Sequence, residues 1–476
     1  MRFEVLTPAE MDLAHKKSLQ ILAKAGVRVK SPKILKMMAA AGCEVCLEQS
    51  IIKFPADIIE ACLKLAPEKF ILGGLHRKHD MFLGEGKSYV TTDGQGCFAA
   101  DLDTDERRDS TMKDLTDAAR LADALDYIQC FWPIVTAGDV PAGSRCLHEI
   151  VECWKVSSKH ITADCFNETQ AEYYEKMLIE ILGSREEIAK RNILSLCCCP
   201  VTPLVFEGSM LEGTVKLGEV GTPVLILPMP ISGTTSPMSL FSTIIQNNAE
   251  VLAGNAILQT AHTGRPVIYG SAAGILDMST SLFSVGSSEG ALQNAACAQM
   301  AKRYKMPNLI SAGGADAQTP GIQSAAERMT AMLLGFLTGS DLICGVGLTA
   351  TAQCLYREEL IIAEDMAGYC RRVANGVRSS EEDTLTDLAI EIGPGGNFLA
   401  EESTVEYLYN GEYFMPKVFS REGYEIWRDS PKRDIIQFAK NKVRDILNRP
   451  VIDNFNAHLS EKLRLILADA DIELAE

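Results

Sequence analysis

Residues 224–270 read VLILPMPISGTTSPMSLFSTIIQNNAEVLAGNAILQTAHTGRPVIYG, and this stretch decides the fold. The apolar run 224–227 predicts a short strand, residues 238–263 predict a long helix, and the run 266–270 predicts the next strand. Both runs are almost continuously hydrophobic, which is typical of strands buried on both faces of a parallel sheet. The stretch therefore predicts one β–α–β unit.

The same alternation of strand, loop and helix continues on both sides of this unit. Eight apolar runs are each followed by a helical stretch, and they lie at 88–92, 128–135, 160–163, 193–198, 224–227, 266–270, 308–311 and 342–346. Eight short strands, each with its own helix, favour an α/β fold of the closed (β/α)8, or TIM barrel, type. An open, doubly wound parallel sheet remains the alternative.

Three regions follow from this pattern. Residues 1–86 are predicted to form an N-terminal helical extension, whose first helix begins at Pro8 after the N-cap Thr7. Residues 87–376 form the barrel. Residues 377–476 form a C-terminal extension that packs on the barrel and ends in two charged amphipathic helices, near 431–447 and 456–471.

Charge and composition exclude several classes of protein. The net charge of −17 comes from 46 basic and 63 acidic side chains, and no basic cluster is present, so we expect no nucleic-acid partner. The sequence begins with no secretory signal and contains no apolar run long enough to span a membrane. We therefore expect a cytoplasmic protein with no membrane contact, in which the 15 cysteines are buried small hydrophobes.

In a barrel of this kind the site lies on the loops that follow the carboxyl ends of the strands. No strand end carries a His/Glu or Ser/His pair for proton abstraction or acyl transfer. Aromatic residues, amides and glycines gather there instead, and aromatic faces attract alkylammonium groups. The candidate substrate-binding residues are Gln95, Phe98, Phe131, Trp132, Phe166, Phe206, Phe283, Gly313, Gly314 and Tyr356. Asp316 and Gln318 are candidates for positioning the substrate, and we assign no catalytic acid or base.

The run Cys197-Cys198-Cys199 raises the question of a zinc site. Consecutive residues of a strand point alternately to opposite faces, so the three thiols cannot all bind one ion. Zinc would need further His or Cys donors at other strand ends. We therefore expect no bound metal.

Four segments of the sequence are distinctive: PMPISGTTSPMSLFSTIIQNNAEVLAGNAILQTAHTGRPVIYGS (228–271), LDMSTSLFSVGSSEGALQNAACAQMAKRY from Leu276, SAGGADAQTPGIQSAAERM from Ser311, and GPGGNFL from Gly393. Together they resemble the trimethylamine methyltransferase family. Within the C-terminal stretch, Glu402-Ser403-Thr404 stands where the family pattern has a His-Thr pair, so no role is carried over to that position.

The resemblance implies a (β/α)8 barrel that passes a methyl group from its substrate to the cob(I)alamin (cobalamin) of a separate corrinoid protein. Trimethylamine-specific members carry pyrrolysine, whereas this chain has only ordinary residues, with the counterpart position near Asp316 to Gln318. The chain thus resembles the non-pyrrolysine branch, whose substrates are quaternary amines such as glycine betaine, proline betaine, carnitine or γ-butyrobetaine. We also expect a homo-oligomer.

This mechanism needs positioning more than acid–base chemistry, because the leaving group is a neutral tertiary amine. An aromatic cage would hold the cation, and backbone N–H groups of the loops 232–235 or 313–318 would hold a betaine carboxylate, with Gln95 and Gln318 as further donors. Two alternatives stay open: a zinc-dependent corrinoid or thiol methyltransferase, and a non-catalytic barrel that binds a betaine.

Overall fold

Eight parallel strands close into a barrel in the order in which they follow one another along the chain. The computed structural model describes residues 3–475. The last strand pairs with the first, Ile343 lying opposite Val90. The strands are β6 (Tyr89–Thr92), β9 (Ile128–Phe131), β10 (His160–Asp164), β11 (Leu194–Cys198), β13 (Val224–Ile226), β15 (Val267–Ser271), β18 (Asn308–Ser311) and β19 (Leu342–Val346). The closed barrel is therefore confirmed, and the open sheet is excluded.

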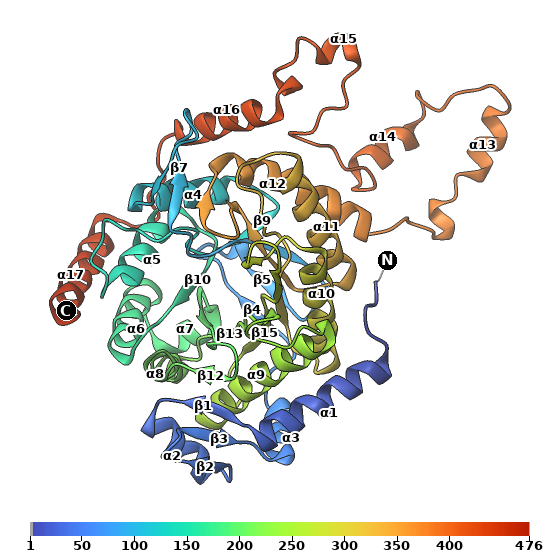
Figure 1. Ribbon diagram of the computed structural model, residues 1–476. Coiled ribbons are helices and arrows are strands. Elements are labelled where there is room, and N and C mark those ends of the chain that lie inside the picture. Colours follow the sequence, from blue (N-terminus) through green and yellow to red (C-terminus); the bar gives the residue numbers. More distant parts are fainter. Residues whose placement is uncertain (1–2, 476) are drawn as a thin grey trace.

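An outer ring of helices surrounds the barrel (Figure 1). It comprises α4 (Met112–Ala124), α5 (Arg145–Val156), α6 (Glu168–Leu182), α7 (Arg185–Arg191), α8 (Gly208–Lys216), α9 (Leu240–Ala261), α10 (Ser288–Arg303), α11 (Ile322–Thr338) and α12 (Arg357–Ala374). The predicted helix 168–189 is two helices, because Gly183 at φ 94° ends α6 and Ser184 caps α7. The predicted strand 128–135 is shorter than expected and ends at Phe131.

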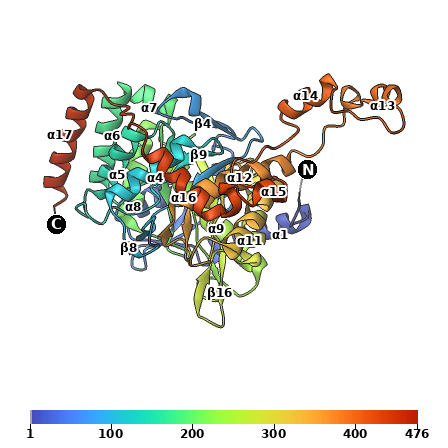
Figure 2. The ribbon, with the colours of Figure 1, turned by 90° about the horizontal axis from the view of Figure 1, so that it is seen from above.

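Side chains of alternate strand residues fill the barrel interior. They are Cys130, Trp132, Cys197, Leu225, Leu227, Ile268, Leu309, Leu342 and Cys344. The hairpin of β4 (Phe70–Leu72) and β5 (Met81–Leu83) closes the amino-terminal end of the barrel with Leu72, Met81 and Leu83. Figure 2 shows β4 on one side of the molecule and the β16 hairpin on the opposite side. The carboxyl ends of the barrel strands, and with them the mouth of the barrel, lie on the side of the β16 hairpin.

The N-terminal extension covers α9, the long helix within the segment 224–270. Helices α1 (Pro8–Lys24) and α3 (Ala56–Leu63) pack on α9. Residues 243–259 of α9 are all buried as a result, as its apolar character on every side requires. Helix α1 begins as predicted, with Thr7 and Glu10 forming a capping box. A second helix, α2, spans Pro32–Ala40.

The extension also contains a small sheet that the sequence did not predict. Strands β1 (Val27–Val29), β2 (Glu44–Cys46) and β3 (Ile51–Lys53) have three residues each, too few to show an alternating pattern. They join β12 (Val205–Phe206), which follows the fourth barrel strand. This pairing fixes the extension to the loop after β11.

Two helices of the C-terminal region pack on the barrel's outer ring. Helix α16 (Ile435–Leu447) contacts α12 and α4, and α17 (Ala457–Glu473) contacts α6 and α5. Between α12 and α16, the short helices α13 (Thr386–Ile392), α14 (Glu402–Tyr409) and α15 (Tyr424–Trp427) lie further out (Figures 1 and 2). None of the helices within residues 3–475 has the length and apolar composition that crossing a membrane would need.

Candidate active site

Three neighbouring strands bring an amide, an indole and a carboxylate together at their carboxyl ends. Gln95 follows β6, Trp132 follows β9 and Asp164 ends β10. The Gln95 Nε2 donates a hydrogen bond to Oδ2 of Asp164. Burial raises the pKa of Asp164 to about 7, although the neighbouring Trp132 indole and the Gln95 amide oppose that rise. The cluster therefore contains a buried carboxylate that changes charge near neutral pH.

The loop after β6 is shaped to meet the indole ring. A Cβ on Gly94 would lie 2.8 Å from ring atoms of Trp132, so only glycine fits there. Gln95 has a φ of 66°, in the left-handed region, and its N–H donates to the Pro133 carbonyl at 2.9 Å. The neighbouring Asp93 is half-buried, and desolvation of its carboxyl raises its pKa to about 6. The close approach of Gly94 and the hydrogen bond from Gln95 to Pro133 together hold this loop against Trp132.

Arg328 of α11 fixes the loops that follow the seventh and eighth strands. Its guanidinium is fully buried and donates to the carbonyls of Gly313, Gly345 and Leu348. Glu359 of α12 lies 3.2 Å from its Nε and neutralises it. This pair places Gly313 and Gly314 against the eighth strand, so both glycines lie at the barrel mouth.

Asp316 connects loops and does not point a free carboxylate at the mouth. It accepts hydrogen bonds from Val285 N–H at 2.9 Å and from the hydroxyls of Ser284 and Thr351. Glu327 in turn accepts the N–H groups of Asp316 and Ala317 at 2.8 and 3.2 Å. Gln318 is exposed beside them. Asp316 can therefore position a substrate only indirectly, through the loops that its carboxylate holds together.

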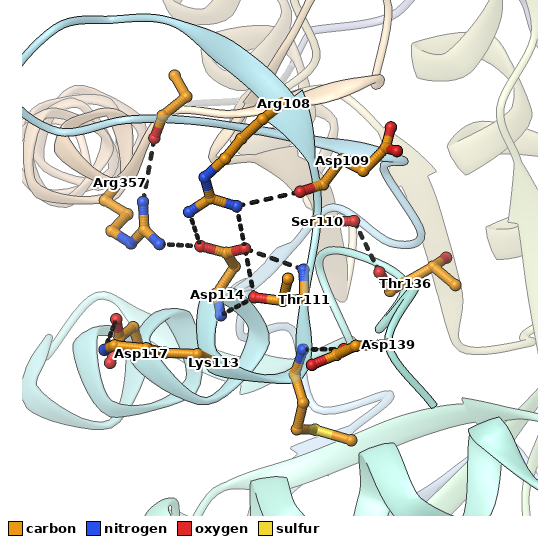
Figure 3. Close-up of polar contacts among 12 residues, drawn as sticks. Arg108, Asp109, Ser110, Thr111, Lys113, Asp114, Asp117, Thr136, Asp139 and Arg357 are labelled. Atoms are coloured by element: carbon orange, nitrogen blue, oxygen red, sulfur yellow. Dashed lines mark hydrogen bonds and ion pairs between the residues drawn. The ribbon is translucent and has the colours of Figure 1, made fainter. Parts of the chain in front are cut away.

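A charged cluster (Figure 3) joins helices of the outer ring to a four-stranded sheet whose strands follow barrel strands β6 and β19. Arg357 pairs with the buried Asp114, which also pairs with Arg108 at 2.7 Å. Arg357 further donates to the carbonyl of Ala100 at 3.1 Å. The cluster therefore joins α12, α4 and two strands of this sheet, which consists of β7 (Phe98–Ala100), β8 (Arg107–Asp109), β20 (Leu348–Thr349) and β21 (Cys354–Leu355).

Phe98 and Tyr356 pack together on this sheet with Ala100, Ala350 and Cys354. The Arg107 guanidinium lies over the Phe98 ring at 3.7 Å from its centroid, so one ring face already binds a cation. Tyr356 is buried and is the N-cap residue of α12. These two aromatics form a unit separate from Trp132.

Two of the predicted aromatics lie away from the mouth. Phe131 alternates with Trp132 along β9 and its neighbouring loop, so it points outward into the core between strands and helices. Phe206 belongs to β12 and packs in the same outer core. Because neither ring reaches the barrel mouth, we leave both out of the proposed cage.

The other two aromatics lie on loops beside the mouth. Phe166, two residues after β10, is 43% exposed. Phe283 belongs to β17 (Leu282–Ser284), which pairs with β16 (Gly274–Asp277), and its ring packs over Gly274. Of these two rings, Phe166 is the more exposed, and it lies two residues after Asp164, where a substrate or a partner protein can contact it.

The two glycine-rich loops use some of their backbone N–H groups internally. In the loop after β13, the N–H groups of Gly233, Thr234 and Ser236 donate to carbonyls of the same turn. In the loop after β18, Glu327 takes those of Asp316 and Ala317. These groups are not free for a substrate carboxylate, and the anion site on the two loops stays a prediction for their other N–H groups.

The side chains of Cys197, Cys198 and Cys199 point alternately to the two faces of the strand, as expected. Cys197 and Cys199 face the barrel interior with their sulfur atoms 3.4 Å apart, and Cys198 packs outward. Within the part of the chain that the structure describes, no group of three or more His, Cys, Asp or Glu side chains is arranged to hold a metal ion.

The site residues predicted from the sequence include aromatics, amides and glycines, but neither Asp93 nor Asp164. The available signal was their position, because each carboxylate directly follows or ends a strand buried on both faces. Glu149 of α5 belongs to the same set: burial raises its pKa to about 7, and the negative charge of Asp164 adds to the rise. The missed feature is thus a set of three acids, Asp93, Glu149 and Asp164, whose pKa values are raised by desolvation.

The fold and these strand ends define the chain as a (β/α)8-barrel protein with its site at the carboxyl ends of the strands. The family model described as trimethylamine methyltransferase (MTTB) matches residues 1–472. The chain belongs to the trimethylamine methyltransferase family, and it is a methyltransferase. The predicted family and enzyme class are thereby confirmed.

The similar proteins agree in length with this chain. Trimethylamine methyltransferase MttB of Methanosarcina thermophila is 29% identical over 470 residues, covering 98% of this chain and 97% of its own. The glycine betaine methyltransferase of Desulfitobacterium hafniense (strain Y51) is 27% identical over 478 residues, covering 100% and 98%. The crystal structure of the Methanosarcina barkeri monomethylamine methyltransferase (MtmB) matches at 12% identity and a TM-score of 0.50, covering 92% and 93%, and supports the barrel fold alone.

Proposed function

We propose that this enzyme transfers a methyl group from a small quaternary amine, a betaine, to the cob(I)alamin of a separate corrinoid protein. The observation that carries the proposal is the cluster of Asp164, Gln95 and Trp132 at the carboxyl ends of three neighbouring strands. The glycine betaine methyltransferase among its relatives supports the same substrate class.

The cluster fits a cation that has no hydrogen to donate. A quaternary ammonium group is recognised by an aromatic face and by a nearby negative charge, without hydrogen bonds. Trp132 offers the indole, and the carboxylate of Asp164 offers the charge once its proton has left. Gln95 holds that carboxylate in place through its amide. The strand ends thus supply both elements of an alkylammonium site.

Methyl transfer from such a cation needs no side-chain base. The quaternary nitrogen leaves as a neutral tertiary amine, and the corrinoid of the partner supplies the nucleophile. The residues of this chain hold the N-methyl group in one orientation and exclude water, because orientation alone removes a large part of such a barrier. The rigid pair Arg328–Glu359 keeps the adjacent loops fixed during this step.

Exposed apolar side chains on the loops after five consecutive barrel strands fit the corrinoid partner. Each follows the carboxyl end of a strand, and exposed apolar patches of this kind mark protein contacts. Ile322 at the start of α11 is 93% exposed, and Met278 on the β16 hairpin is 70% exposed. The others are Phe166, Val201, Met229 and Leu282. The partner would approach the side from which the substrate enters.

We also propose the cytoplasm as the compartment and a homo-oligomer as the functional state. All 15 cysteines, each within the described residues, are free and most are buried, as expected in a reducing environment.

The experiment is incubation of the purified enzyme with reduced free cobalamin and with glycine betaine, proline betaine, carnitine or γ-butyrobetaine. We expect one of them to lose a single methyl group, detected by mass spectrometry of the demethylated amine, in proportion to the loss of cob(I)alamin absorbance. Binding of a betaine without demethylation would show a non-catalytic barrel instead. Activity that needs added zinc would favour the zinc-dependent alternative.

A further inference from the structure

Residues 377–411 leave the barrel as an arm that buries none of its own side chains. The arm starts after α12, carries α13 and α14, and projects away from the barrel in both views (Figures 1 and 2). The residues after the arm pack on the body again. The Phe414 ring contacts those of Tyr127 and Tyr369, and Glu412 forms an ion pair with Arg372 at 2.9 Å. Both ends of the arm are thus fixed to the body.

Apolar side chains on the arm lie open to solvent. They are Val377, Leu385, Ile390, Phe398, Leu399, Val405, Leu408 and Tyr409, among which Leu399 is 82% and Tyr409 73% exposed. Monomeric proteins rarely expose so many large hydrophobic side chains on one segment. Helices of seven and eight residues are also too short to be stable without packing. The arm therefore needs a surface to cover it.

The charge of the arm limits what that surface can be. Residues 377–411 contain eight acidic side chains and one basic one, Arg378. A second acidic surface would repel the arm, and the chain as a whole carries a charge of −17. A basic and partly apolar surface would attract it.

Such a surface lies on the same chain, at the amino-terminal end of the barrel. A cavity of about 620 Å³ is lined by five basic side chains, Lys69, Lys87, Lys302, Lys305 and Arg371. Tyr89, Met306, Phe336 and Leu337 add apolar walls. Of its two acids, Asp341 is turned inward onto the N–H groups of Gly84 and Asn308, and Glu68 pairs with Lys305 at 3.1 Å. The cavity is thus a basic, partly apolar surface on an acidic protein.

We propose that the arm of one copy of this chain covers the basic cavity of a second copy. The arm leaves the chain at the rim of the cavity, since Asn375 lines it, yet points away from its own barrel. When two copies exchange arms about a twofold axis, each cavity receives eight carboxylates and an apolar face. The exchange forms a closed pair and leaves the barrel mouth free.

Charge reversal tests this arm exchange in the full-length protein. We expect the wild type to have, by light scattering, the mass of two 51.9 kDa chains or an even multiple of it. Lys69→Glu with Lys87→Glu in the cavity, or Glu391→Lys with Glu402→Lys in the arm, is expected to raise the dissociation constant of the pair at least about tenfold. The four changes together restore opposite charges and are expected to restore the pair.

Lys36→Glu with Lys64→Glu is the matched control. It makes the same change in net charge on exposed lysines of the N-terminal extension and is expected to leave the mass unchanged. A wild type that stays monomeric would overturn the proposal. An assembly that survives both the arm and the cavity reversals would overturn it as well.

Zero-length cross-linking identifies which chain each arm contacts. A carbodiimide joins carboxylates to amines, and the arm has acids but no lysine. In a mixture of ¹⁴N and ¹⁵N protein, arm peptides are expected to be joined to the Lys69 or Lys87 peptide of the other isotope. Joins within one isotope alone would overturn the exchange. An arm that cross-links the corrinoid protein while the chain stays monomeric would assign the arm to that partner instead.

Discussion

The side-chain amide of Gln95 donates to the carboxylate of Asp164, and this bond spans from the first barrel strand to the third. Trp132 follows the strand between them, so the three side chains form one group across three neighbouring strands. Gln95 reaches Asp164 from a left-handed backbone conformation, which costs energy unless the surrounding structure imposes it. The strain is concentrated at the group that we propose to bind the cation.

Asp164→Asn is expected to weaken substrate binding and to remove most of its pH dependence. Burial raises the pKa of Asp164 to about 7, and a bound cation favours the carboxylate, so affinity for the amine rises as pH increases through 7 and falls below it. Asparagine has no proton to lose. At pH 8 we expect the KM to rise at least about tenfold, with a nearly flat KM between pH 6 and 8.

Glu364→Gln is the control for that measurement. Glu364 is also buried and burial raises its pKa, but it accepts the N–H groups of Asp126 and Tyr127 at the opposite end of the barrel. The KM of Glu364→Gln is expected to depend on pH in the same way as that of the wild type. If the pH dependence survives in Asp164→Asn, the titrating group is Asp93 or Glu149 and the proposed role of Asp164 is wrong.

Trp132→Ala is expected to reduce kcat/KM through the lost aromatic face. Desolvated cation–π contacts contribute about 1–2 kcal/mol, which corresponds to a loss of about five- to thirtyfold. Trp132→Phe keeps a ring and is expected to retain part of the activity.

The neighbouring Phe131→Leu separates this effect from a loss of packing. Phe131 points into the outer core, so its replacement is expected to lower the melting temperature and leave KM unchanged. Equal losses of kcat/KM in the two variants would argue against a cation site at Trp132.

The sequence predicted the barrel well because its strands are buried on both faces and therefore read as apolar runs. The strands β18 and β19 agree with their predicted bounds residue by residue. The three-residue strands β1, β2 and β3 were missed because such short segments are stabilised by pairing partners distant in sequence, such as Val205 of β12.

The site was predicted less well, because a strand end does not reveal which way its side chain points. Phe131 and Trp132 are adjacent, and the alternation along the strand sends one outward and the other to the barrel interior. The Gly-rich loops were expected to offer free N–H groups, yet Glu327, nine residues after Gln318 in the sequence, takes two of them. Such partners become visible only when the chain is folded.

Asp114→Asn is expected to destabilise the fold more than most single substitutions. It leaves the buried Arg357 without its carboxylate, and removing one partner of a buried pair costs about 3–5 kcal/mol. Burial alone would raise the pKa of Asp114, but hydrogen bonds from Arg108 and Thr111 and the charge of Arg357 lower it. That stabilisation is present above the ordinary Asp pKa and is lost as pH falls below it.

Urea unfolding at pH 7 and at pH 3, which lies below the ordinary Asp pKa, measures both effects of this substitution. The free energy of unfolding of Asp114→Asn is expected to be lower at pH 7 and to fall less than that of the wild type on acidification. Asp109→Asn, which changes an exposed carboxylate in the adjacent strand, is expected to match the wild type at both values. An unchanged unfolding free energy for Asp114→Asn would show that the arginines find other partners.

The enzyme is expected to use at least one betaine and not trimethylamine. A neutral tertiary amine is a poor methyl donor, because its leaving group would be a strongly basic amide anion unless the nitrogen is first alkylated or protonated. The loop after β18 offers Gly313, Gly314, Asp316 and Gln318, and none of these side chains is an electrophile that could activate the nitrogen. A quaternary nitrogen already carries the positive charge that makes its amine a fair leaving group. Glycine betaine, proline betaine, carnitine, γ-butyrobetaine and trimethylamine are to be compared at equal concentration, by cob(I)alamin absorbance under strict reduction. Turnover of trimethylamine together with inactivity towards every betaine would contradict this prediction and the proposed substrate class.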